Sequence, residues 1–325
     1  MGKLAIIDGD VLCHLACAPR WQDKAKKFDT AGGGEYVATQ LDADGSKQVI
    51  EFSADEDNLY LDKSWKSFQS RLQQLLETLY CTDYVMAVQG DGNFRKTLYP
   101  DYKGNRHKDP KKQNKFVPII RHFAVQEGLA IWSHGREADD FVRIWAEEAR
   151  ASGDDFIVCS IDKDLMRIEG MHYRMREKQI VMVDAKFGQR FYYQQLLCGD
   201  GGDNIPGLPG IGPKTAPKLL EEVGTEEEFQ EIVIEQYMTA YGDDWWSYLL
   251  SNGKMIHIQS AVDDYFTLEE WPLAQALGNP NPEIPPSEKE DKVKELPIIG
   301  VTEEAIEVMA EKLKPEIISA RDIVI

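Results

Sequence analysis

The sequence lacks the long apolar runs of a membrane protein. No uninterrupted apolar stretch among its 325 residues approaches the roughly 18 residues that a transmembrane helix needs. The stretch from Met1 to Ile7 is followed by Asp8 and lacks the charged-then-apolar layout of a signal peptide. We therefore expect a cytoplasmic protein without a membrane partner.

Cysteine is also scarce. The chain has five cysteines, an odd number, and they lie mostly inside apolar stretches: Cys13, Cys17, Cys81, Cys159 and Cys198. This usage is typical of reduced thiols and not of a disulfide framework. There is no CxxC pair and no Cys/His cluster, so nothing in the sequence indicates a zinc site.

Positive charge is the third shortage. The chain has 37 Lys and Arg against 56 Asp and Glu, a formal net charge of -19. Because phosphate binding needs a basic surface, this balance alone argues against a nucleic-acid partner. The distribution argues the other way, since basic residues crowd one segment that only Asp109 interrupts: Lys103, Arg106, Lys108, Lys111, Lys112 and Lys115. A merely solvated loop is the alternative interpretation of this segment.

Strand-like and helix-like patterns alternate along the first 180 residues, which predicts an α/β fold with a mainly parallel central sheet and helices on both faces. The expected strands are Lys3–Ile7, Tyr84–Val88, Ala130–Trp132 and Phe156–Ile161, and the expected helices include Leu61–Leu79, Phe116–Glu127 and Glu137–Ala151. This core (1–180) would carry an insertion (22–62), containing a hairpin that turns at Asp44-Gly45, and a basic arch (95–118). A helical region (181–278) and then a linker with a last helix, Thr302–Leu313 (279–325), would follow.

Acidic residues follow three of the predicted strands. Asp8, Asp91 and Asp162 each end a strand or come shortly after one, with Asp164 two residues further on. The predicted helix from Glu137 adds Asp139 and Asp140 in its first turn. Carboxyl ends of parallel strands meet at one edge of a sheet, so these side chains should converge there.

Any one of these carboxylates could be an ordinary cap or turn residue, but as a set they would repel one another. Hard divalent cations with a preference for oxygen relieve such repulsion. We therefore predict a magnesium or manganese site. Two ions about 4 Å apart would suit in-line hydrolysis of a phosphodiester.

A glycine-rich segment, Gly199–Ala216, provides a second candidate site. Glycines at this density let backbone N–H groups approach a phosphate, and a helix start would add its positive end. The part from Gly207 has the form of a helix-hairpin-helix loop that grips the backbone of a duplex without reading its sequence. The alternative interpretation is a glycine-rich connecting loop with no binding role. The GxxxxGK[ST] spacing of a P-loop is absent.

Taken in order, Asp8, Asp91 with Arg95, Tyr102-Lys103-Gly104-Asn105-Arg106, Glu137-Ala138-Asp139-Asp140, Asp162-Lys163-Asp164 and the glycine-rich segment resemble the flap endonuclease superfamily. The size is similar to that of phage-type 5′-to-3′ exonucleases and of the nuclease domain of bacterial DNA polymerase I. The resemblance spans about Lys3 to Val223. It implies a PIN-like core followed by a helix-hairpin-helix (helix-three-turn-helix) motif, and the cytoplasm of a bacterium or of a phage-infected host.

The resemblance also implies roles for residues. One metal ion would be held by Asp8, Asp91, Glu137 and Asp139 with Asp140 beside it, and the other by Asp162, Asp164 and Asp203 with Asp200 adjacent. Mg²⁺ is the expected ion at both positions, with Mn²⁺ able to substitute, and K⁺ is a candidate at the helix-hairpin-helix loop. Lys103 would contact the scissile phosphate with help from Arg106, and Tyr102 would stack on a terminal base. The remaining DNA-binding residues would be Arg95, Gly207, Gly210, Gly212, Lys214 and Thr215.

The expected function is a metal-dependent 5′-to-3′ exonuclease and flap endonuclease, monomeric, that cleaves DNA during replication, repair or host DNA degradation. RNA in primers or in RNA/DNA hybrids is a further candidate substrate, and the sequence leaves open whether it is cleaved as readily as DNA. One alternative is a DNA-structure-binding protein that has lost catalysis, which would gain nothing from an intact, mutually repelling acidic set. Another is a PIN-type ribonuclease, although such domains are usually shorter and lack the helix-hairpin-helix segment. The sequence leaves open the balance between exonuclease and flap cleavage.

Overall fold

The computed structural model describes residues 2–17, 38–41, 47–50, 56–105, 114, 116–281 and 318–319. Most of the expected basic arch (106–113 and 115) and the expected last helix, Thr302–Leu313, lie outside these residues. Within the described part of the chain, no helix is both long enough and apolar enough to cross a membrane. The five cysteines are free thiols, as expected.

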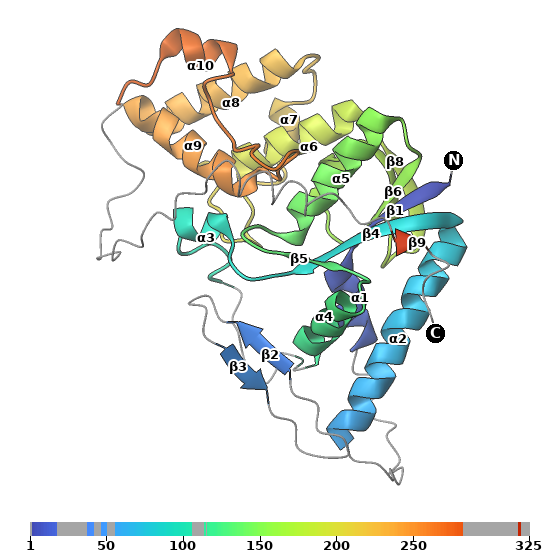
Figure 1. Ribbon diagram of the computed structural model, residues 1–325. Coiled ribbons are helices and arrows are strands. Elements are labelled where there is room, and N and C mark those ends of the chain that lie inside the picture. The colour runs from blue at the N-terminus through green and yellow to red at the C-terminus, as the bar shows by residue number, and fades with distance from the viewer. Residues whose placement is uncertain are drawn as a thin grey trace, which may run out of the picture.

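A mainly parallel sheet forms the centre of the molecule (Figure 1). Its strand order is β5 (Ile131–Ser133), β4 (Cys81–Gln89), β1 (Lys3–Asp8), β6 (Phe156–Ser160), β7 (Gly170–Arg174) and β8 (Gln179–Val183). The β5–β4, β4–β1, β1–β6 and β6–β7 pairs are parallel, and β7–β8 is antiparallel. A two-residue strand, β9 (Ile318–Ser319), pairs antiparallel with β4.

The central strands are apolar on both sides because helices cover both faces of the sheet (Figure 1). One face packs against α1 (Gly9–Ala16), α2 (Glu56–Leu79) and α4 (Val117–Gln126), and the other against α5 (Ala138–Ser152). Alternation along β1 fits this arrangement: Ala5 and Ile7 belong to the first core, whereas Ile6 belongs to the core under α5. The predicted fold class is confirmed.

Two hairpins flank this core, one expected and one missed. β2 (Ala38–Leu41) pairs antiparallel with β3 (Lys47–Ile50), which confirms the hairpin expected in the insertion. The sequence analysis did not predict the antiparallel β7–β8 pair, and β8 runs to Val183, two residues past Val181, beyond which the chain was expected to be helical. β8 is an edge strand, and the residues on its exposed face include the apolar Ile180 and Met182. Its sequence therefore lacks the alternation of polar and apolar residues that marks a strand with one buried face.

A helical region with its own core follows β8. Its helices are α6 (Ala185–Cys198), α7 (Ala216–Leu219), α8 (Glu226–Tyr241), the 3-10 turn η3 (Gly242–Asp244), α9 (Trp245–Ile256) and α10 (Pro272–Leu277). Asp184 caps α6 by accepting a hydrogen bond from the backbone N–H of Phe187. Trp245 and Trp271 are buried in this core.

Three arginines of the sheet domain hold the end of α9 and the two residues that follow it. Arg95, on the short helix α3 (Phe94–Leu98), donates to the carbonyls of Met255 (3.0 Å) and His257. Arg167, at the end of the 3-10 turn η2 (Asp164–Arg167), donates to the carbonyl of Ile256, and Arg143 of α5 donates to that of Ile258. The segment 255–258 therefore joins the helical region to the sheet.

Candidate active site

The first acidic group lies at the carboxyl ends of β1 and β6. Asp8 is the last residue of β1 and is 7% exposed. The Ser160 hydroxyl donates to Asp8 Oδ2 (2.9 Å) and accepts from the backbone N–H of Asp162 (3.0 Å), so it links the two aspartates. Burial, together with repulsion by Asp10 and Asp162, raises the pKa of Asp8 to about 7.

Asp139, in the first turn of α5, belongs to the same group. Desolvation, followed by repulsion from Asp8, Asp162 and Glu137, raises the pKa of Asp139 well above its usual range. The expected convergence of Asp8, Asp162 and the start of α5 is therefore present. A group of carboxylates that repel one another in this way suits a hard divalent cation, which prefers oxygen ligands.

The second acidic group lies around η2 and the glycine-rich segment. Gln195 of α6 donates to Asp164 Oδ1 (2.7 Å), and Lys163 binds Asp200 Oδ2 (2.8 Å) and lies 3.5 Å from Asp164 Oδ1. Burial and the charge of Asp162 raise the pKa of Asp164. Burial alone would raise the pKa of Asp200 as well, but the hydrogen bond and the charge of Lys163, together with hydrogen bonds from the backbone N–H groups of Gly202 and Asp203, outweigh it and the pKa is lowered.

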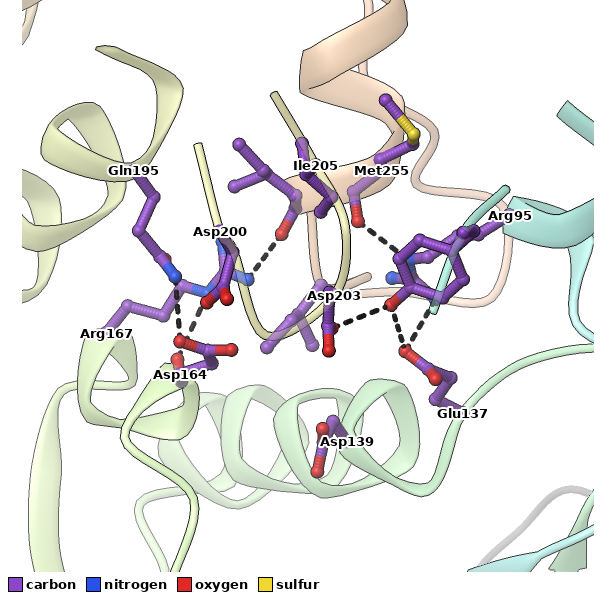
Figure 2. Close-up of a pocket in the computed structure, with 13 residues that line it drawn as sticks. Arg95, Glu137, Asp139, Asp164, Arg167, Gln195, Asp200, Asp203, Ile205 and Met255 are labelled. Atoms are coloured by element: carbon purple, nitrogen blue, oxygen red, sulfur yellow. Dashed lines mark hydrogen bonds and ion pairs between the residues drawn. The ribbon is translucent and has the colours of Figure 1, made fainter. Parts of the chain in front are cut away.

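One pocket is lined by Asp139 of the first group and by Asp164 and Asp200 of the second, whereas Asp8 and Asp162 do not line it (Figure 2). Figure 2 shows the side chains of Asp139, Asp164, Asp200 and Asp203 around it, with Glu137 on the side of Arg95. Among the residues that the structure describes, no three Asp, Glu, His or Cys side chains have the geometry to hold a metal ion as they stand, although Asp8, Asp139 and Asp162 lie close enough to repel one another. Lysine, arginine and hydroxyl side chains of the protein bind several of these carboxylates, so a metal ion would have to compete with those side chains.

The start of the basic segment docks on the turn that carries Asp200 and Asp203. The backbone N–H of Lys103 donates to the carbonyl of Asp203 (2.8 Å), Asn105 Nδ2 donates to that of Gly201 (2.5 Å), and Asn204 Nδ2 donates to that of Asp101 (2.9 Å). Neither asparagine was given a role from the sequence, because each contact joins residues about a hundred positions apart.

Lys103 lies at the acidic pocket, where the resemblance places it. Its backbone is left-handed, with φ 57°, which turns its side chain back over the site. Its ammonium binds Glu137 Oε1 and lies 3.5 Å from Asp203 Oδ2. In this structure Lys103 is therefore a counter-ion for two predicted metal ligands.

Tyr102 is placed differently from its expected role. It is 3% exposed and packs in the core of the helical region. Its hydroxyl donates to Glu137 Oε2 (2.8 Å) and lies 3.1 Å from Asp203 Oδ2. The expectation that Tyr102 stacks on a terminal base does not fit this burial, because its ring faces have no access to a base.

Arg95 and Asp140 also require correction. They are 1% and 0% exposed and form a bidentate ion pair, so Arg95 is not placed to contact DNA. Burial alone would raise the pKa of Asp140, but hydrogen bonding and the charge of Arg95 lower it. Both oxygens of Asp140 face Arg95, so its expected place beside a metal ion does not fit either.

Asp91 and Arg106 are less closely tied to the site. Asp91 follows β4 and is half-buried, with its backbone N–H 3.3 Å from His134 Nδ1 and its carbonyl accepting from the N–H of Gly135. Its place at this edge agrees with the strand-end prediction, and its role as a ligand stays a prediction. Arg106 lies outside the described residues.

The glycine-rich segment is less helical than expected. α7 has four residues, and Thr215 before it is itself in the α-helical conformation, so this start offers little of the expected helix-end charge. Lys214 and Thr215 are exposed and accessible to a phosphate. Gly210 has φ 77°, and a Cβ at Gly212 would meet nothing within 4 Å.

Gly207 has a structural role. A Cβ there would lie 2.2 Å from the carbonyl oxygen of Cys198, at the point where the loop leaves α6. Sequence reasoning also missed Gln195 and the structural use of Ser160. Gln195 gave no signal because a glutamine inside a helix usually faces solvent, and Ser160 was seen only as part of a strand end.

Comparisons with known proteins assign the family. A model described as 5′-3′ exonuclease, N-terminal resolvase-like domain, matches residues 54–192. The chain is 30% identical over 205 residues to the flap endonuclease Xni of Photorhabdus laumondii subsp. laumondii, covering 59% of this chain and 79% of that protein. With a relative matched over most of its length, the chain belongs to the superfamily of 5′-3′ exonucleases and flap endonucleases. The resemblance read from the sequence is thereby confirmed.

Two further proteins are similar to this chain. It is 41% identical over 141 residues to DNA polymerase I of Rhizobium leguminosarum, covering 40% of this chain and 14% of that protein. Among solved structures, T5 5′-exonuclease with divalent metal ions (zinc) bound matches with a TM-score of 0.46 and 16% identity, covering 78% of this chain and 97% of that chain. The chain thus spans only a small part of the polymerase that it matches.

The glycine-rich loop gives a prediction with a built-in control. Gly212→Ala should leave the melting temperature within about 2 °C, since the new Cβ meets open space, but should weaken binding to duplex DNA of any sequence. Gly207→Ala should lower the melting temperature by more than about 4 °C, because its Cβ would collide with the Cys198 carbonyl. Thermal melting and fluorescence anisotropy with two unrelated duplexes measure both effects. Unchanged binding by Gly212→Ala would argue against backbone contact at this loop.

Proposed function

We propose that this protein is a divalent-metal-dependent nuclease that hydrolyses DNA from 5′ ends, as a 5′-3′ exonuclease and flap endonuclease. The observation that carries the proposal is the crowding of Asp8, Asp139 and Asp162 at one end of the sheet, where burial and mutual repulsion raise the pKa of the first two. Such crowding is unfavourable in an isolated protein and useful in one that binds cations. Membership of the family supports the reaction class.

The donor set fits two ions of the Mg²⁺ or Mn²⁺ type. Asp8, Asp139 and Glu137, with Asp91, would hold one, and Asp162, Asp164, Asp200 and Asp203 would hold the other. Every donor is a carboxylate, which matches the oxygen preference of these ions. When bound, the ions would supply an activated water and stabilise charge on the phosphorus centre and on the leaving oxygen.

The lysines of the pocket would change partners when substrate arrives. Lys103 and Lys163 hold Glu137, Asp203 and Asp200 in this structure. A scissile phosphate at the pocket would offer Lys103 a third anion beside Glu137 and Asp203, and the negative charge of that phosphate would grow as the bond breaks. Lys103 would then act on the reacting phosphate, whereas Lys163 would orient Asp200.

The substrate is proposed to be DNA with a 5′ end, either flapped or in a duplex, with primer RNA as a further substrate. The exposed Lys214 and Thr215 would hold the duplex backbone, and K⁺ is a candidate ion at that loop. The basic run from Lys103 to Lys115 would lead the strand to an otherwise acidic surface. The protein would work as a monomer in the cytoplasm.

Replacing one shared carboxylate tests the metal site. Asp162→Asn should nearly abolish Mg²⁺-dependent cleavage of a labelled 5′-flap substrate, because a ligand is lost. The melting temperature of the metal-free variant should stay the same or rise, since repulsion with Asp8 and Asp139 is relieved. Asp154 is exposed and lies two residues before β6, so Asp154→Asn is the matched control and should cleave normally. Full activity in Asp162→Asn would refute the two-metal assignment.

Removing the charge of Lys103 tests its proposed role. Lys103→Met keeps the apolar stem and should lower kcat by about 10² to 10³, while the dissociation constant for DNA changes by less than about threefold. Single-turnover cleavage and anisotropy separate the two quantities. Lys96→Met, which removes an exposed lysine on α3, is the control. An equal loss in turnover and in binding would make Lys103 a tether for DNA and not a catalytic residue.

Polarity of cleavage can be tested without any variant. The enzyme should release 5′-phosphorylated mononucleotides or short oligonucleotides. In-line attack on phosphorus expels the 3′ oxygen, so the released fragment ends in a 3′ hydroxyl and the remaining strand begins with a 5′ phosphate, which the next product carries. A covalently closed circle and a duplex capped by a hairpin at its 5′ side should resist digestion. If label were lost from the 3′ end, with 5′-capped duplex degraded at the same rate, the direction assigned here would be wrong.

A further inference from the structure

Arg95 and Asp140 form an ion pair that water does not reach, between the helix before the basic segment and the acidic start of α5. Arg95 Nη1 donates to Asp140 Oδ2 (2.8 Å) and Nη2 donates to Asp140 Oδ1 (2.7 Å). The side chains are 2% and 0% exposed. Two parallel hydrogen bonds between a guanidinium and a carboxylate fix both groups in orientation as well as in distance.

Backbone donors complete the coordination of Asp140. The N–H of Glu137 donates to Oδ2 (2.9 Å), and the N–H of Gln259 donates to Oδ1 (3.0 Å). A carboxylate has about four lone-pair sites, and here four protein donors point at them. No oxygen of Asp140 is therefore left to face a cation in the acidic pocket.

The same pair holds the neighbours of Asp140 in place. Glu137 is the N-cap of α5, and its bond from the backbone to Asp140 is half of a capping box. Arg95 Nη1 also lies 3.8 Å from Glu137 Oε2. The direction of Glu137, and of Asp139 one residue before Asp140, therefore depends on where Arg95 holds Asp140.

We infer that Arg95 and Asp140 are positioning residues and that Asp140 is not a metal ligand. Their pairing fixes the first turn of α5, so that Glu137 and Asp139 face the pocket and Asp140 faces away from it. This inference rests on the proposed function only for the identity of the cation, because the pairing itself exists without one.

A simpler role for Arg95 would be to fasten the segment 255–258, and Arg143 offers the matched control. Arg143 is also a partly buried arginine of the sheet domain, and it donates to the carbonyl of Ile258 in the same segment. Within the described part of the chain, Arg143 makes no hydrogen bond or ion pair with Asp140 or Glu137. Arg143→Met therefore removes fastening and a pair with Glu147 (3.8 Å) further along α5, whereas Arg95→Met removes fastening and positioning.

The first experiment is a double-mutant cycle in the metal-free protein. Arg95→Met and Asp140→Leu should each lower the melting temperature by more than about 5 °C, because each leaves a buried charge without its partner. The double variant should lose much less than the sum of the two, since neither charge remains. Additive losses would overturn the pairing whether or not the protein binds a metal ion.

The second experiment counts Mn²⁺ by electron paramagnetic resonance without nucleic acid. Asp140→Asn should bind as many Mn²⁺ ions as the unmodified chain, whereas Asp139→Asn should bind fewer. Arg95→Met should weaken Mn²⁺ affinity in the same direction as Asp140→Asn, each by up to about tenfold, as expected when ligands lose their support. If Asp140 were a ligand, Arg95→Met would free its carboxylate and tighten binding, and Asp140→Asn would lose an ion; that result would overturn the inference.

The third readout separates positioning from fastening. Arg95→Met should lower kcat by about tenfold or more, with KM for a flap substrate within about threefold, while Arg143→Met keeps kcat within about threefold. Equal kcat losses in the two variants would reduce Arg95 to a fastener. Absence of Mn²⁺ binding in the unmodified chain would refute the proposed function, and the metal-free cycle would still decide the pairing.

Discussion

Repulsion among carboxylates at one end of the sheet is the constraint on which the rest of this site depends. Parallel strands β1 and β6 end side by side, so Asp8 and Asp162 are brought together by the topology itself. The start of α5 adds Asp139 to them. Such a group is tolerated only if the surroundings hold each carboxylate in place and a cation can enter. The neighbouring residues supply the first requirement.

The protein's own cations divide this task among them. Arg95 neutralises Asp140 completely and lies too deep to exchange partners. Lys103 and Lys163 hold Glu137 and Asp200 from more accessible positions. Arg95 therefore stabilises the scaffold, whereas the two lysines can give up their partners when stronger charges arrive. The centre of the group keeps its raised pKa values at Asp8 and Asp139, which marks where an external cation is most needed.

Sequence reasoning found what periodicity and chain order determine. Buried strands that end in aspartate predicted the sheet and the meeting of Asp8 and Asp162, because both follow from strand direction alone. It could not tell whether a charged or aromatic residue of a motif faces inward. Arg95 and Tyr102 belong to the family motifs, yet both are buried, because partners far along the chain, Met255 and Asp203, take up their polar atoms. Pairings of this kind leave no local pattern.

The same long-range contacts show that neither half of the molecule contains the site. The sheet domain supplies Asp8, Glu137 and Asp139, and the turn after α6 supplies Asp200 and Asp203. The two sets meet because residues 101–105 dock on that turn and because residues 255–259 lie along the sheet domain. Arg95 takes part in the second contact while it fixes α5, so one buried guanidinium ties the acidic helix to the region that would grip a duplex. A disturbance of the helical region would thus reach the carboxylates through Arg95 without any change in the sheet.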